Sequence, residues 1–163
     1  MKRAASLCAL LCALALAPAF GVTQSQTLLI TASVPANCVV GSHMDVDFGV
    51  YNPAAQTAPL DVTANALQVA CTKGASGVRI ALGNGLTHRG AHRQMTRSSG
   101  PGALQYDIYT SPARSTVWNQ INTVSYTSQT NQPVTLAFYG RINGGQQAPP
   151  GTYLDTVLAM VNF

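Results

Sequence analysis

The chain has 163 residues, of which 47% are hydrophobic and 9% are charged, and its formal net charge is +4. This composition is too apolar for a disordered chain, and the length suggests one ordinary domain. The sequence contains no Glu, and all five acidic residues are Asp. Any site that depends on a Glu base or a Glu ligand, such as the HExxH metalloprotease motif, is therefore excluded.

The N-terminus has the pattern of a secretory signal peptide. Lys2 and Arg3 precede an apolar run over residues 7–17, and small residues follow up to Ala19. We expect a signal peptide at residues 1–19, with cleavage after Ala19 or, as second choice, after Gly21. About 11 apolar residues cannot cross ~30 Å of hydrocarbon. The mature chain then has 144 residues and a net charge of +2. We expect no membrane insertion after cleavage, and this charge gives no reason to expect nucleic-acid binding.

The expected mature chain retains two cysteines, Cys38 and Cys71. In an exported protein, two cysteines are the right number for one disulfide, and the alternative is two buried free thiols. Zinc prefers four ligands, so a lone pair is a poor metal site. We expect neither a metal nor a cofactor.

The mature chain favours short strands separated by Gly and Pro turns, with no long helical pattern. Many short strands of this kind predict an antiparallel β-sandwich. The stretch Gly83–Gly102 is rich in glycine and is interpreted as a mobile hairpin or loop. The expected strands run through Thr27–Val34, Cys38–Val40, Met44–Phe48, Leu67–Cys71, Val78–Leu82, Leu104–Ile108, Val134–Phe138 and Tyr153–Phe163.

The last expected strand, Tyr153–Phe163, is apolar on both faces. A strand that faces water alternates with polar residues, so this one is expected to be covered on both faces or to have a partner beside it. Because the sequence stops at Phe163, we expect a segment from elsewhere to cover this edge, and the alternative is that the edge stays exposed.

Two groups of basic residues have the spacing of a binding site. His88 and His92 have the spacing of two ligands on a helix face, but glycines surround them and no Asp lies within ten residues, so a fortuitous loop pair is favoured. Arg89, Arg93 and Arg97 also repeat at four. In a Gly-rich loop they are interpreted as a solvated surface, and contact with an anionic surface or polysaccharide is the alternative.

Other chemistry is weakly supported, and we do not expect an enzyme. Asp45 and Asp47 would lie about 7 Å apart on one strand face, which invites comparison with a glycosidase pair, but turn-side surface charges are more common. Trp118, with Tyr106 and Tyr109, has the chemistry to stack on a sugar ring, but core packing is the favoured interpretation.

A set of short segments occurs in a characteristic order over nearly the whole mature chain. With the signal peptide and the two cysteines, this set resembles the spore coat protein U domain family, whose fold is that of the pilins of archaic chaperone–usher (Csu-type) pili. The segments are Cys38-Val39-Val40, Phe48-Gly49-Val50-Tyr51, Val69-Ala70-Cys71, Arg93-Gln94-Met95, Tyr106-Asp107-Ile108-Tyr109, Trp118, Gly151 to Val157 and Val161-Asn162-Phe163.

The resemblance implies an all-β fold: an incomplete immunoglobulin-like antiparallel β-sandwich that is completed by a donor strand. Residues 20–36 would be the N-terminal donor-strand extension, and residues 37–163 the pilin domain. Gln24 and Gln26, on the same face as the expected donor side chains, are poor pocket fillers. The alternative is that Thr27–Val34 is the first strand of a complete sandwich. The donor side chains would be Leu28, Ile30, Ala32 and Val34.

The resemblance also implies the partners and the other site residues. A Cys38–Cys71 disulfide would join the first two strands of the sandwich. The partners would be a periplasmic pilus chaperone, an outer-membrane usher and neighbouring pilin subunits, and the product would be a surface pilus for adhesion and biofilm formation. The alternative function is a self-contained extracellular β-sandwich that binds carbohydrate or another surface ligand. The acceptor groove and chaperone contact would comprise Tyr153, Val157, Ala159, Val161 and Phe163.

Overall fold

The computed structural model describes residues 24–43 and 45–163, and this part of the chain contains strands and no helix. No helix long and apolar enough to span a bilayer occurs among these residues. The predicted signal peptide and its cleavage sites lie outside the described residues. The strands are β1 (Cys38–His43), β2 (Leu60–Cys71), β3 (Val78–Leu82), β4 (Arg93–Arg97), β5 (Ala103–Tyr109), β6 (Val124–Tyr126), β7 (Val134–Ile142), β8 (Tyr153–Leu154) and β9 (Ala159–Asn162).

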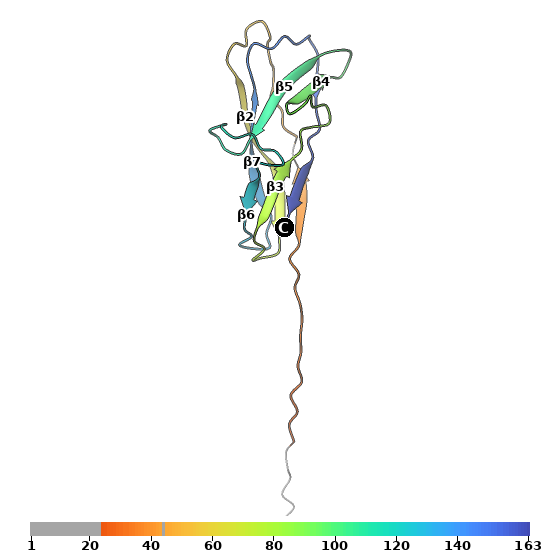
Figure 1. Ribbon diagram of the computed structural model, residues 1–163, viewed down its shortest axis with the longest axis vertical. Coiled ribbons are helices and arrows are strands. Elements are labelled where there is room, and N and C mark those ends of the chain that lie inside the picture. The colour runs from red at the N-terminus through yellow and green to blue at the C-terminus, as the bar shows by residue number, and fades with distance from the viewer. Residues whose placement is uncertain (1–23, 44) are drawn as a thin grey trace, which may run out of the picture. The chain divides into compact units, whose positions relative to one another are not determined.

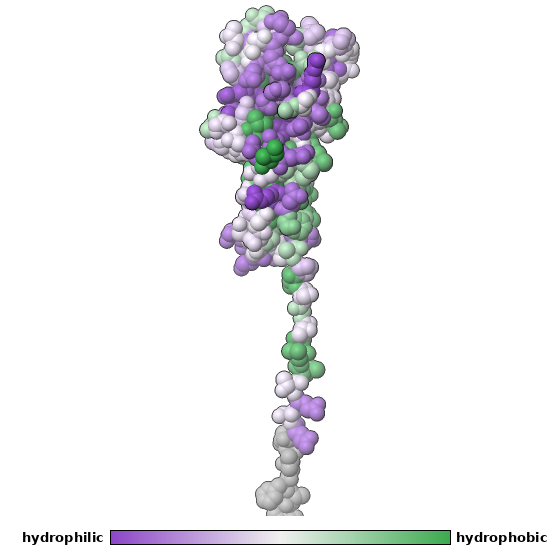
Figure 2. All heavy atoms as spheres, in the orientation of Figure 1, coloured by the Kyte–Doolittle hydropathy of each residue, from purple (hydrophilic) through white to green (hydrophobic). Residues whose placement is uncertain are grey.

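The described residues fall into two units, one that ends at Ser33 and one that covers Val34–Phe163. In the first unit, residues 24–33 carry no regular secondary structure, so the strand expected from Thr27 is not formed. Leu28, Leu29 and Ile30 are 81%, 82% and 84% exposed. Figure 2 shows this segment with several apolar (green) side chains open to solvent.

The second unit consists of two antiparallel sheets (Figure 1). One has six strands in the order β1-β2-β7-β5-β4-β8, and the other has three in the order β6-β3-β9. The longest ladder pairs β2 with β7, from Leu60 opposite Ile142 to Val69 opposite Val134. The predicted all-β, antiparallel sandwich is confirmed.

The core is formed by alternate side chains of both sheets. Val78, Ile80 and Leu82 point inward from β3, as the sequence alternation predicts. Trp118 is 2% exposed and donates an indole N–H bond of 2.8 Å to the carbonyl of Ile80. This residue joins the loop before β6 to the smaller sheet, so its ring is part of the core and is not free to stack on a sugar.

Two strands were not foreseen from the sequence. β4 lies inside the stretch Gly83–Gly102 that was expected to be a loop, and it pairs with both β5 and β8. Its sequence, RQMTR, lacks an apolar alternation because its buried first position is an arginine, Arg93. β6 is only three residues long, which is too short to leave a periodic signal.

Several expected strands are also wrong in extent, and β2 begins at Leu60 rather than at Leu67. Residues 45–48 form no strand. The predicted strand Tyr153–Phe163 is divided into β8 and β9, with residues 155–158 between them. The division has a physical cause: β8 pairs with β4 in the larger sheet, whereas β9 pairs with β3 in the smaller one. The chain changes sheets at residues 155–158, and one continuous ladder is therefore impossible.

Candidate functional site

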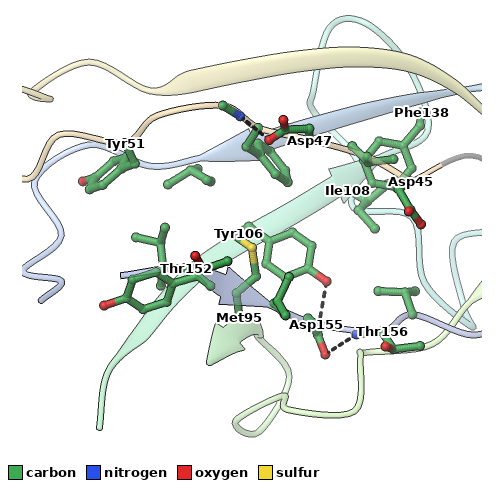
Figure 3. Close-up of a pocket in the computed structure, with 18 of the residues that line it drawn as sticks. Asp45, Asp47, Tyr51, Met95, Tyr106, Ile108, Phe138, Thr152, Asp155 and Thr156 are labelled. Atoms are coloured by element: carbon green, nitrogen blue, oxygen red, sulfur yellow. Dashed lines mark hydrogen bonds between the residues drawn. The ribbon is translucent and has the colours of Figure 1, made fainter. Parts of the chain in front are cut away.

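A groove of about 1420 Å³ opens into the sandwich. One wall consists of residues 45–54 and the other of residues 148–159. Core side chains, among them Leu104, Tyr106, Ile108 and Phe138, form its floor. In the close-up of Figure 3, Asp47 and Tyr51 lie along one side, Thr152, Asp155 and Thr156 lie along the other, and Tyr106 lies between them. The hydrophobic interior of the sandwich is thus accessible from outside.

Edge strands of both sheets contribute to the lining of this groove: Val40 from β1, Leu154 from β8 and Ala159 from β9. β1 and β8 are the two terminal strands of the six-stranded sheet, and β9 is one of the two terminal strands of the three-stranded sheet. The Cα atoms of β1 and β9 approach within 8 Å, although the two strands belong to different sheets. A terminal strand presents a row of free N–H and C=O groups to any chain that lies beside it.

The groove walls themselves are incompletely paired. The backbone N–H of Gly49 donates to its neighbour Asp47 Oδ1 at 2.7 Å rather than to a strand. On the other wall, the carbonyls of Thr156 and Leu158 accept backbone bonds of 2.9 and 2.8 Å from Leu86 and Gly83, on one side only. The prediction of a strand at Met44–Phe48 failed for this reason: residues 45–48 follow the groove, and no strand lies beside them.

Asp155 anchors the point at which the final segment changes sheets. Its Oδ2 accepts a 2.8 Å bond from the Tyr106 hydroxyl. Its Oδ1 accepts bonds from the Thr87 N–H (3.1 Å), the Thr87 hydroxyl (3.0 Å) and the Thr156 N–H (2.8 Å). Burial and the bond to the Asp155 carboxylate raise the pKa of Tyr106 well above its ordinary value. These contacts hold one groove wall in place.

Gly85 leaves room for this carboxylate. It adopts φ +92°, and a Cβ at this position would lie 2.0 Å from Asp155 Oδ2. Only glycine combines this backbone conformation with so close an approach. The glycine-rich stretch that suggested a mobile loop therefore supports the groove wall.

Arg93 was expected in a solvated basic stripe, and that interpretation is wrong. Its side chain is 1% exposed. Nε and Nη2 donate to the carbonyl of Gly83 at 2.9 and 2.6 Å, and Nη2 also donates to the carbonyl of Trp118 at 2.7 Å. Burial lowers the pKa of its guanidinium. Spacing alone cannot separate such a structural arginine from its neighbour Arg89, which is exposed.

The two histidines lie on an exposed turn in which Arg89 and His92 form an isolated bridge. The His88 ring is 3.0 Å from the carbonyl of Gly90. Among the residues that the structure describes, there is no group of three side chains suited to hold a metal ion.

The residues predicted for the acceptor groove are distributed as follows. Tyr153, Val157 and Ala159 line the groove. Val161 packs on the core, and Phe163 is 60% exposed; neither lines the groove. The residues of the opposite wall were not predicted from the sequence: there, Phe48 packs edge-on against Tyr106 with ring centroids 5.7 Å apart. The segment Phe48-Gly49-Val50-Tyr51 was noted only as part of the resemblance, and its role depends on contacts that are distant in sequence.

The remaining predicted residues lie close to the start of the domain. Cys38 and Cys71 form a disulfide, as predicted, with an S–S distance of 2.08 Å. They are directly opposite each other in the ladder of β1 and β2. Leu28, Ile30 and Ala32 are exposed in the first unit, and Val34, the first residue of the second unit, is 81% exposed.

Comparisons with known proteins agree with this fold. Protein U of Myxococcus xanthus is 32% identical to the chain over 162 aligned positions, and the match covers 91% of the chain and 90% of that protein. Among solved structures, the chain is similar to one described as the CsuC–CsuE chaperone–tip adhesion subunit pre-assembly complex of archaic chaperone–usher Csu pili from Acinetobacter baumannii. That match has 26% identity and a TM-score of 0.55, and it covers 80% of the chain but only 40% of the solved one. The sequence profile of the Spore Coat Protein U domain matches residues 24–160. The chain therefore belongs to the Spore Coat Protein U domain family.

Proposed function

We propose that this chain is an exported structural pilin subunit that polymerises by donor-strand exchange. The N-terminal segment of one subunit adds as a strand to the groove of the next, which is a known mode of recognition at open sheet edges. The observation that carries the proposal is a large apolar groove that opens into the core between residues 45–54 and residues 148–159. The mechanism is non-covalent and needs neither a catalytic residue nor a cofactor. The fibres would serve adhesion and biofilm formation at the cell surface.

The donor segment has the chemistry that such a groove requires. Leu28, Ile30, Ala32 and Val34 share one face of an extended strand. Burial of the three larger side chains is worth roughly 5–9 kcal/mol, at about 1.5–3 kcal/mol each, before any ladder hydrogen bonds are counted. Gln24 and Gln26 lie on the same face and contribute little apolar area. The binding free energy is therefore concentrated in residues 28–34.

The proposal also assigns partners along the export route. A signal peptide at residues 1–19 would direct the chain to the periplasm, with residues 20–36 as the extension and 37–163 as the pilin domain. A periplasmic chaperone would fill the groove until an outer-membrane usher brings the next subunit. Two features support a chaperone: the Csu subunit to which the chain is similar was solved with one, and an unfilled groove exposes core side chains to water. The C-terminal carboxylate of Phe163 would anchor the chaperone.

The test is a melting curve of the oxidised domain Ala36–Phe163 with and without a peptide of residues 22–34. A control peptide carries Ile30→Asp, which places a charge in the apolar face. We expect the natural peptide to raise the Tm by more than ten degrees, since a few kcal/mol correspond to about 4 °C each in a domain of this size. We expect no rise with the control. A high Tm that neither peptide changes would mean that the fold is complete without a donor strand, and carbohydrate ligands would then be tested.

A further inference from the structure

Thr72 holds the segment through which the N-terminal extension leaves the domain. Its N–H donates a 2.8 Å bond to the carbonyl of Asn37, and its hydroxyl accepts a 3.1 Å bond from the Asn37 N–H. The same hydroxyl lies 3.3 Å from the carbonyl of Pro35. These bonds continue the pairing of β1 with β2 past the disulfide, so that residues 35–37 extend in line with β1.

The residues on either side of this contact resist a reversal of the chain. Pro35 has a fixed φ and lacks an N–H, and a residue before proline, here Val34, is restricted to extended conformations. Tight hairpin turns need residues with positive φ, usually Gly or Asn-Gly. Residues 34–37 contain no glycine, and none of them adopts positive φ. The chain is therefore poorly suited to fold back at this point.

A fold-back would compete directly with polymerisation. The free edge of β1 begins at Cys38, shortly after the extension. A hairpin at residues 35–37 would place the extension along this edge, which contributes Val40 to the lining of the subunit's own groove. A tethered segment acts at an effective concentration of about millimolar, whereas a separate subunit at micromolar concentration is about a thousandfold more dilute. A subunit whose groove is filled by its own extension accepts no other.

We propose that Thr72 is a positioning residue that keeps the extension out of its own groove and so directs it to another subunit. This inference rests on the proposed function and adds to it the reason that exchange occurs between chains. Thr72 acts through residues 35–37, with Pro35 as its partner in this role.

The test compares refolded, oxidised mature chains that carry Thr72→Val, which keeps the side-chain shape and removes the hydroxyl. The matched control is Thr135→Val, at an exposed threonine of β7. Each chain is refolded at about 1 μM, the monomer is isolated by size exclusion, and a labelled peptide of residues 22–34 is added. Monomer that takes up the peptide has an open groove, and monomer that refuses it is self-filled.

We expect Thr72→Val to raise the fraction of monomer that does not bind the peptide about fivefold over wild type, because the loss of one hydrogen bond has an effect of this size. We expect Pro35→Gly to raise it further, and Thr72→Ser and Thr135→Val to match wild type. If Thr72→Val and wild type gave the same fraction of monomer that does not bind the peptide, the inference would be overturned. A higher fraction in Thr72→Ser than in wild type would also overturn it. Peptide binding by the domain Ala36–Phe163 separates the two proposals. If this domain binds the peptide but Thr72→Val has no effect, only the role of Thr72 is refuted. If this domain does not bind the peptide, both proposals fail.

Discussion

Replacement of Arg93 by Met tests whether a buried cation without a carboxylate partner stabilises this fold. Arg93 is 1% exposed, and its three hydrogen bonds all end on the carbonyls of Gly83 and Trp118. In the described part of the chain, no carboxylate lies within ion-pair distance of its guanidinium, since both ion pairs there involve Asp61. The guanidinium is therefore stabilised by two backbone carbonyl dipoles, that of Gly83 directly after β3 and that of Trp118 in the loop before β6.

Opposing effects set the magnitude. Arg93→Met keeps most of the apolar stem but leaves two buried carbonyls without a donor, at a cost of about 1–3 kcal/mol each. The substitution also removes the desolvation penalty of a buried charge, which offsets part of this loss of stability. We therefore expect a loss of about 2–4 kcal/mol in the free energy of unfolding. Arg93→Lys should also be destabilising, because a single ammonium does not reproduce the planar fork of the guanidinium.

Urea unfolding of the oxidised mature chain measures this change. The single tryptophan, Trp118, reports on the site directly, because its carbonyl accepts one of the bonds. Arg89→Met is the matched control, since the same substitution at an exposed position should stay within about 0.5 kcal/mol of wild type. If Arg93→Met were as stable as Arg89→Met, the burial cost would equal the hydrogen-bond gain and the reasoning would be refuted.

Three further predictions concern the groove wall and the start of the domain. Gly85→Ala should cost about 2–4 kcal/mol and abolish peptide uptake, because its methyl group would displace the Asp155 carboxylate; unchanged uptake would contradict this role. Replacement of both Cys38 and Cys71 by Ser should lower the free energy of unfolding by about 4 kcal/mol, because the disulfide closes a loop of about 33 residues in the unfolded chain. Urea unfolding measures this change. Burial raises the pKa of Tyr106 above its ordinary 10.0, so folding keeps the phenol neutral while the unfolded chain ionises. Stability should therefore fall above about pH 10, and Tyr106→Phe should flatten that fall.

The sequence predicted the parts of the fold that depend on local pattern. Alternating apolar residues located β3, β5 and β7, and the count of two cysteines predicted the disulfide that the structure contains. The doubly apolar end of the chain indicated that an edge needed cover. Strand alternation is carried by neighbouring residues, and the disulfide follows from the number of cysteines in an exported chain, so neither prediction needs the tertiary structure.

The tertiary structure decided what depends on residues far apart in the chain. Residues 45–54 and 148–159 become opposite walls of one groove, and no periodicity links them. Arg93 has the spacing of a surface arginine, and only the carbonyls of Gly83 and Trp118 make it a buried one. The final segment divides at Asp155 because two sheets compete for it. A sequence pattern specifies which side chains prefer burial, but the partner of each hydrogen-bonding group is fixed only when distant segments meet.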